Sequence, residues 1–174
     1  RVSTDIAFSM DFWFNQSSVG LQYIVDWRDG TPHNGYLYTN NNMTAMAFWG
    51  IGHSAETTIT ITRSLNTWYH FLYSRHTDGT WGVYIDGKMY SQGTGDGESA
   101  PDHKLTIGKW NAGSNYYFDG YLDNIRFTTT DVTKDTTDPL YTGATHAAAS
   151  TSANNFNAGL PTKAYGSSNT ITIN

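Results

Sequence analysis

The sequence predicts an all-β protein folded as a two-sheet antiparallel sandwich or jelly roll. Three observations predict this fold class. Apolar and polar residues alternate with a period of two in many short runs, Asp-Gly and Asn-Gly dipeptides separate these runs, and no window shows a sustained apolar period of 3.6. Aromatic residues make up 15% of the 174 residues, which is enough to fill one substantial core.

The clearest alternation covers residues 6–14, where the apolar side chains at even positions share one face of a predicted half-buried strand. Further strands are predicted at residues 21–26, 35–38, 43–49, 57–63, 68–74, 81–85, 104–109 and 116–127. Turns are predicted at residues 29–30, 34–35, 78–79, 86–87 and 119–120, because Asp-Gly and Asn-Gly adopt the positive φ of tight hairpins. We expect Trp68, Trp81, Val83 and Ile85 to face the core and His70 to be a packed strand residue.

The composition divides the chain into two parts. Residues 1–143 form the predicted jelly-roll domain, and residues 144–174, which are rich in Ala, Ser, Thr, Asn and Gly, form a predicted extended polar arm. The arm is either weakly ordered or held by a neighbour through its alternating segment 170–173. Because the first residue is Arg1 rather than Met, we expect a processed product or a segment of a longer polypeptide.

Charge and hydropathy exclude several classes of partner. Only 14% of the residues are charged, the net charge is −5 and the basic residues are scattered, so we expect no nucleic-acid binding. No apolar run is long enough to span a bilayer, so we expect no membrane insertion. The absence of cysteine excludes disulfides, thiol nucleophiles and Cys-ligated zinc.

Several ordered segments resemble the laminin G-like domains of the concanavalin A-like lectin/glucanase superfamily. They are Phe8–Phe14, Trp68–Phe71, Arg75–Lys88, Leu105–Gly108 and Phe118–Phe127, which match the family's core strands and its "Y-V-D-G" and "F-x-G-x-I-D" signatures in order and spacing. The resemblance implies a concanavalin A-like jelly roll. Together with the charge-poor composition, it also implies a module on an extracellular or virion surface, of the kind found in phage surface and tail-fibre proteins.

Catalysis is not expected. Retaining glycoside hydrolysis needs two carboxylates about 5–5.5 Å apart. The chain has only two glutamates, Glu56 and Glu98, which lie far apart in sequence and in turn-like contexts. The family's Glu-x-Asp-x-Glu strand is missing, and no Gly-x-Ser-x-Gly elbow is present. We therefore predict a protein that is not an enzyme.

A structural calcium ion is a further expectation. The resemblance implies that Asp123, which matches the Asp of the family's last signature strand, helps to hold calcium, and Asp5 is a possible second carboxylate. The alternative is that Asp123 caps strand backbone or pairs with Arg126. Transition metals are not expected, because the six histidines show no ligand spacing.

Two loops combine aromatic rings with planar polar side chains, as carbohydrate sites do, and both follow predicted strands. Either set of aromatics could instead serve packing, and for Trp27 packing is favoured. The candidate carbohydrate-binding residues are Trp27, Asp29, His33, Asn34 and Tyr36 in the first loop, and Trp110, Asn111, Asn115, Tyr116 and Tyr117 in the second.

Two functions remain open at this point. The first is a non-catalytic, lectin-like module that binds a surface glycan. The second is a purely structural phage decoration or fibre protein that uses its C-terminal arm to form a homo-oligomer or to join other virion proteins.

Overall fold

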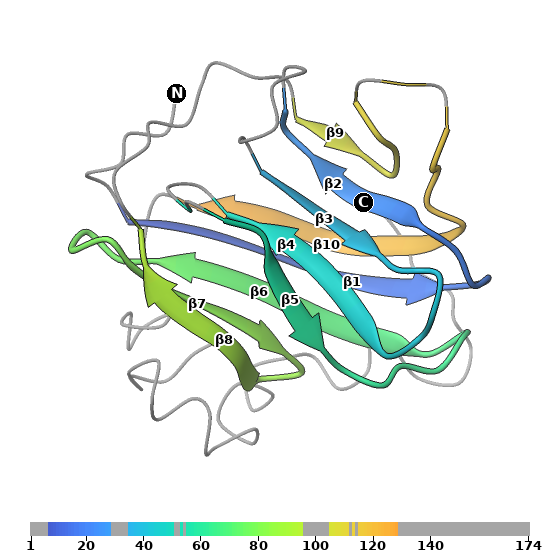
Figure 1. Cartoon of the computed structure of the whole chain (residues 1–174), viewed down its shortest axis with the longest axis horizontal. Helices are drawn as coiled ribbons and strands as arrows, with labels where there is room; N and C mark the ends of the chain where they lie inside the picture. The colour runs from blue at the N-terminus through green and yellow to red at the C-terminus, as the bar shows by residue number, and fades with distance from the viewer. Residues whose placement is uncertain are drawn as a thin grey trace.

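The computed structural model describes residues 7–28, 35–50, 53, 55–95, 105–111, 113 and 115–128. These residues form ten strands in two five-stranded antiparallel sheets, which lie one over the other in Figure 1. Within these ranges there is no helix, and so none that could cross a membrane. The strands are β1 (Phe8–Gln16), β2 (Gln22–Asp26), β3 (Tyr36–Thr39), β4 (Ala45–Trp49), β5 (Thr57–Thr60), β6 (Trp68–Arg75), β7 (Thr80–Ile85), β8 (Lys88–Thr94), β9 (Thr106–Ile107) and β10 (Gly120–Thr128).

The two sheets confirm the predicted all-β sandwich. The strand order is β10-β1-β6-β7-β8 in the first sheet and β5-β4-β3-β2-β9 in the second. β1 lies between β10 and β6, so the first strand of the described chain is paired with the last. β9 and β10 each stand at one end of their sheet.

The core lies between the sheets and consists of the inward-facing residues of both. Phe12 of β1 stacks on Phe71 of β6 with ring centroids 5.1 Å apart. Phe48 of β4 in the other sheet lies 5.6 Å from Phe71 and 4.8 Å from Tyr73. All four side chains have no exposed surface. Burial of each such side chain contributes about 1.5–3 kcal/mol to hydrophobic stabilisation. Because the even-numbered apolar residues of β1 share one face, that face packs against the second sheet.

The prediction that β1 is only half-buried is wrong, because its outer face is also covered. Ser9 and Asp11 are 0% and 3% exposed. The Ser9 and Ser74 hydroxyls lie 2.8 Å apart, and Arg126 Nε donates to Asp11 Oδ2 at 2.8 Å. His70 Nε2 lies 3.5 Å from the other oxygen of Asp11. These polar partners allow the outer face of a central strand to be buried without an apolar pattern.

Most turn predictions that fall within the described residues hold. Asp86 and Gly87 have φ values of 51° and 76° and connect β7 to β8, as the hairpin prediction requires. The sequence did not predict β8, which is a polar strand at the end of its sheet. The Asp119-Gly120 dipeptide does not form a hairpin but leads into β10.

Trp68 was expected in the core but lies outside it. Its backbone is opposite Asn15 of β1, and its ring lies 6.5 Å from that of Tyr121 on β10. The neighbouring Tyr69 packs against the core instead. The predicted arm at residues 144–174, and the domain boundary at residue 143, lie outside the described residues and stay predictions.

Candidate functional site

A bulge in β2 places two side chains of the candidate site on the outer face of the second sheet. Tyr23 lies opposite Tyr38 of β3, and Asp26 lies opposite Tyr36, with a register shift between them. Residues three apart in a regular strand face opposite sides, but the extra residue of a bulge brings them to the same side. Ile24 and Val25 within the bulge are both buried in the core. The bulge thus directs Ile24 and Val25 into the core and leaves Tyr23 and Asp26 on the outer face.

Aromatic rings form a continuous cluster on this side of the sheet, in which Tyr23 and Tyr36 are themselves 8% and 6% exposed. The Tyr23 ring lies at its centre, 5.0 Å from Tyr38, 6.0 Å from Tyr36, and 6.3 Å from both Trp110 and Tyr116. Trp49 extends the cluster over β4, 6.1 Å from Tyr36. We call this set the aromatic face; its members are Tyr23, Tyr36, Tyr38, Trp49, Trp110 and Tyr116.

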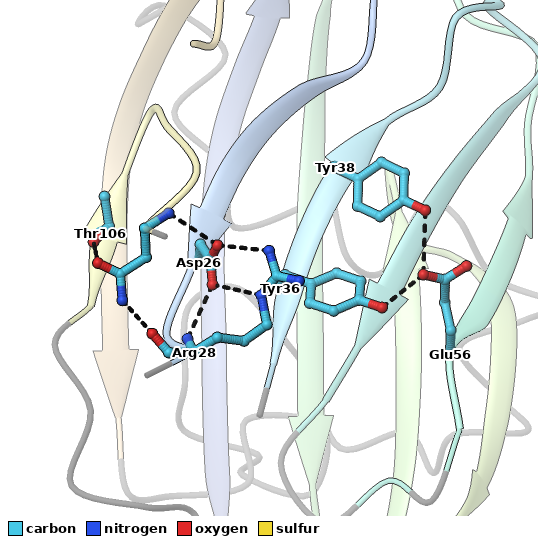
Figure 2. A network of polar contacts seen from close by, with 7 residues as sticks. Asp26, Arg28, Tyr36, Tyr38, Glu56 and Thr106 are labelled. Atoms are coloured by element: carbon cyan, nitrogen blue, oxygen red, sulfur yellow. Dashed lines mark hydrogen bonds and ion pairs between the residues drawn. The ribbon is translucent and has the colours of Figure 1, made fainter. Parts of the chain in front are cut away.

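The Asp26 carboxylate joins the two loops that the sequence singled out. It is fully buried, and four donors reach it. Arg28 donates to it from its backbone N at 2.9 Å, from Nε at 3.0 Å and from Nη2 at 2.8 Å, and the backbone N of Asn111 donates at 3.0 Å. Figure 2 shows Asp26 at the centre of this network. Four charge-assisted hydrogen bonds compensate for the burial of the carboxylate.

Asn111 completes the junction between the loops. Its side-chain amide donates to the carbonyl of Arg28, and its amide oxygen accepts from Thr106 Oγ1 at 3.1 Å. A further backbone bond, from Tyr23 N to the Tyr116 carbonyl at 3.1 Å, fixes the second loop along β2. Segments more than 80 residues apart in sequence therefore form one surface.

Arg28 lies between the Asp26 carboxylate and two rings of the aromatic face. Its guanidinium carbon is 4.4 Å from the Tyr36 ring centroid and 5.0 Å from that of Tyr23. Burial lowers the pKa of Arg28, but the hydrogen bonds and charge of Asp26 outweigh burial and raise that pKa above its usual value. The guanidinium is therefore a permanent cation that lies over the two tyrosine rings.

Glu56 lies at the other side of the aromatic face, between β4 and β5. Its Oε2 accepts from the hydroxyl of Tyr36 at 2.7 Å and from that of Tyr38 at 3.2 Å, as Figure 2 shows. Burial, with the hydrogen bond and charge of Glu56, raises the pKa of Tyr36. Burial and the Glu56 charge raise the pKa of Tyr38 to about 12. Both phenols are therefore protonated donors at neutral pH.

The structure separates the predicted site residues into groups. It brings together Tyr36, Trp110, Asn111 and Tyr116, as described above. Trp27 is 9% exposed and packs edge-on against Phe48, so the structure favours the packing alternative for this residue. Asn115 and the 58%-exposed Tyr117 lie on the surface beside Tyr116. Asp29, His33 and Asn34 lie outside the described residues.

The sequence reasoning missed Tyr23, Tyr38, Arg28 and Glu56 as site residues. The available signal was in the strands rather than in the loops. Tyr36 and Tyr38 alternate around the buried Leu37, which is the pattern of two aromatic side chains directed away from a core. Glu56 carries no such local signal, because its phenol partners lie 20 and 18 residues away in sequence.

The structural calcium ion stays a prediction. Asp123 lies on β10 opposite Trp13, and Arg126 pairs with Asp11. Asp5 is outside the description, and the described residues contain no group of three acidic or histidine side chains that could hold a metal ion. One carboxylate does not provide the six to eight oxygens that calcium takes, so a site would need Asp5 and carbonyl oxygens near the chain start.

Three solved structures illustrate the similarity of the fold. A candidate carbohydrate-binding protein from Bacteroides ovatus has a TM-score of 0.60 at 17% identity, over 80% of this chain and 44% of that one. Domains LG4-5 of the mouse laminin alpha1 chain have a TM-score of 0.54 at 12% identity, over 72% and 36%. Botulinum neurotoxin type C, whose cell entry depends on interaction with two ganglioside molecules, has a TM-score of 0.53 at 15% identity, over 74% and 33%.

This chain therefore spans less than half the length of each of these three structures. A comparison with curated proteins finds no match. The family model described as the concanavalin A-like lectin/glucanases superfamily matches residues 2–137, which include every described strand. The chain belongs to the concanavalin A-like lectin/glucanases superfamily.

Proposed function

We propose that this chain is a non-catalytic, lectin-like module that binds carbohydrate on the aromatic face. The observation that carries the proposal is the contact of Trp110 and Tyr116 from one loop with Tyr23 of β2, whose ring also contacts Tyr38 of β3. Sugar rings present C–H faces that pack on aromatic rings, and their hydroxyls need planar polar partners at the rim. The aromatic face has both, since Glu56 and Asn111 border it.

The polar groups of the face support binding rather than hydrolysis. The Asp26 carboxylate accepts four hydrogen bonds and is buried, so it is not placed to act as a nucleophile. Glu56 is held by two phenols. Glycoside hydrolysis needs one carboxylate to deliver a proton and a second to attack or to activate water. The proposal also includes an extracellular location for this module.

The experiment compares two single variants in a glycan array and in titrations with the glycans that the array identifies. Trp110→Ala removes a ring from the aromatic face and should weaken binding about tenfold, which corresponds to about 1.4 kcal/mol. Tyr121→Ala is the matched control, because Tyr121 is 65% exposed on β10 of the other sheet. Absence of binding by the unsubstituted chain, or an equal effect of both variants, would refute the proposal.

A second candidate function, assembly into a virion or another extracellular structure, is favoured by the open edge between β9 and β10. Ile107 lies opposite the buried Val25, and Phe127 lies opposite the buried Met10, yet they are 42% and 40% exposed. Inward-facing residues with that much exposure form an apolar edge that the other described residues do not cover. We propose that this edge receives the segment 170–173 of a neighbouring copy.

The assembly proposal is tested with paired substitutions in the full chain. Ile171→Asp with Ile173→Asp should convert an oligomer into a monomer by light scattering, because these two side chains share one face of the alternating segment. Thr170→Asp with Thr172→Asp places the same charge on the opposite face and should leave the mass unchanged. A monomeric unsubstituted chain, or equal effects of the two pairs, would contradict assembly through this segment.

A further inference from the structure

We propose that the aromatic face selects uncharged glycans and discriminates against sugars that carry carboxylate, sulfate or phosphate groups. The inference rests on the proposed function and names the class of ligand. It follows from how the charged side chains at the face, Asp26, Arg28 and Glu56, are already engaged with one another and with the tyrosines.

The Nε–Nη2 edge of the Arg28 guanidinium is already occupied by Asp26. Arg28 uses Nε and Nη2 to bind both oxygens of Asp26, which is the two-pronged geometry that a ligand carboxylate would otherwise take. Its guanidinium carbon lies over the rings of Tyr23 and Tyr36, and its side chain is only 15% exposed. Arg28 therefore stiffens the face and neutralises Asp26.

Glu56 leaves the face with a negative charge. Its carboxylate is exposed, and its hydrogen-bonding partners are two neutral phenols. Among the described side chains that bond to one another or to the tyrosines here, Asp26, Arg28 and Glu56 sum to −1 + 1 − 1 = −1. An anionic sugar placed on the neighbouring rings would meet the carboxylate of Glu56, and the two like charges would repel each other.

An uncharged sugar meets complementary groups at the same place. The tyrosine hydroxyls approach Oε2 of Glu56, which leaves acceptor capacity on the carboxylate for sugar hydroxyls. Trp110 and Tyr38 are partly exposed and Tyr116 is 45% exposed, so their rings can receive the C–H face of a pyranose. None of these contacts requires an ion pair, and so binding should depend little on salt.

The test uses the full chain and a glycan array that pairs each uncharged oligosaccharide with its sialylated, sulfated and uronic-acid derivatives. We expect the anionic derivatives of a bound glycan to bind at least about tenfold more weakly than the parent. Affinity for the parent should change less than about twofold between low and high sodium chloride. Tighter binding of an anionic derivative, or a steep loss of affinity with salt, would overturn the inference and leave the lectin function intact. Binding of neither class would instead overturn the proposed function.

A variant isolates the role of the carboxylate. Glu56→Gln keeps a planar acceptor beside Tyr36 and Tyr38 but removes the charge, so the ratio of uncharged to anionic affinity should fall by about tenfold. Asp78→Asn is the matched control, since it makes the same charge change in the turn between β6 and β7 of the other sheet. An unchanged ratio in Glu56→Gln, or an equal change in both variants, would refute the charge argument.

Discussion

His53 makes the stability of the sandwich depend on pH below neutrality. Its side chain is 3% exposed and stacks on Trp81 with centroids 3.8 Å apart, and it contacts the edges of Phe48 and Tyr73 at 5.5 and 5.6 Å. Burial, assisted by the charge of Arg75, lowers the pKa of His53 from 6.5 to about 3. Between about pH 3 and pH 6.5, the imidazole of His53 is therefore neutral in the folded protein and protonated in the unfolded chain.

The sign and size of the effect follow from this difference in pKa. Above pH 6.5 both states are neutral at His53, and the stabilising preference is fully present. As the pH falls from 6.5 towards 3, the unfolded state gains a proton that the folded state does not, and stability decreases by about 1.4 kcal/mol per pH unit. At pH 5 the loss is about 2 kcal/mol, a large part of a typical stability of about 5–15 kcal/mol.

Urea unfolding, followed by tryptophan fluorescence at about pH 7 and about pH 5, measures this loss. His53→Phe keeps a ring against Trp81 and cannot be protonated, so it should lose about 2 kcal/mol less than the unsubstituted protein between the two pH values. Other titrating groups cancel in this difference. His53→Leu provides a smaller replacement if phenylalanine does not fit. An identical pH dependence with and without His53 would refute the reasoning.

Three further predictions concern packing and calcium. Gly35→Ala should destabilise the fold and change the near-ultraviolet circular dichroism of Trp27, because Gly35 has φ +106° and an added Cβ would lie 1.6 Å from Trp27 Nε1. Phe48→Ala should cost about 3–5 kcal/mol in urea unfolding, because its fully buried ring contacts both sheets; a loss below about 1 kcal/mol would contradict the central position of Phe48. If calcium is bound, its addition should raise the thermal midpoint of the unsubstituted chain and not that of Asp123→Asn, and calorimetry without any calcium effect would remove the prediction.

The fold could be predicted because period-two alternation is a local signal. Phe8, Met10, Phe12 and Phe14 share one face whatever the rest of the chain does, and the structure places all four in the core. Burial of Asp11 on the opposite face could not be predicted in this way. It depends on Arg126 of β10, more than 100 residues away in sequence, and a pairing between distant strands leaves no mark in the local pattern.

The site was predicted in part for the same physical reason. Composition pointed to Trp110 and Tyr116 in one loop and to Tyr36 near another, but the residue that joins them is Tyr23 in a strand. Its position depends on the bulge in β2, and the residues of that bulge are apolar and resemble an ordinary buried strand. The composition of the loops therefore indicated which segments contain aromatic side chains, but it could not indicate which of these side chains contact one another.

The bulge links stability to recognition. If β2 were regular, a residue three positions after Tyr23 would face the core, and the Asp26 carboxylate would be buried among apolar side chains, which is costly for an unpaired charge. With the bulge, Asp26 lies opposite Tyr36 and reaches Arg28 and Asn111. The irregularity that lets this sheet tolerate a buried carboxylate is thus the same one that assembles the aromatic face. A substitution that restores regular pairing in β2 should therefore impair folding and the proposed glycan binding together.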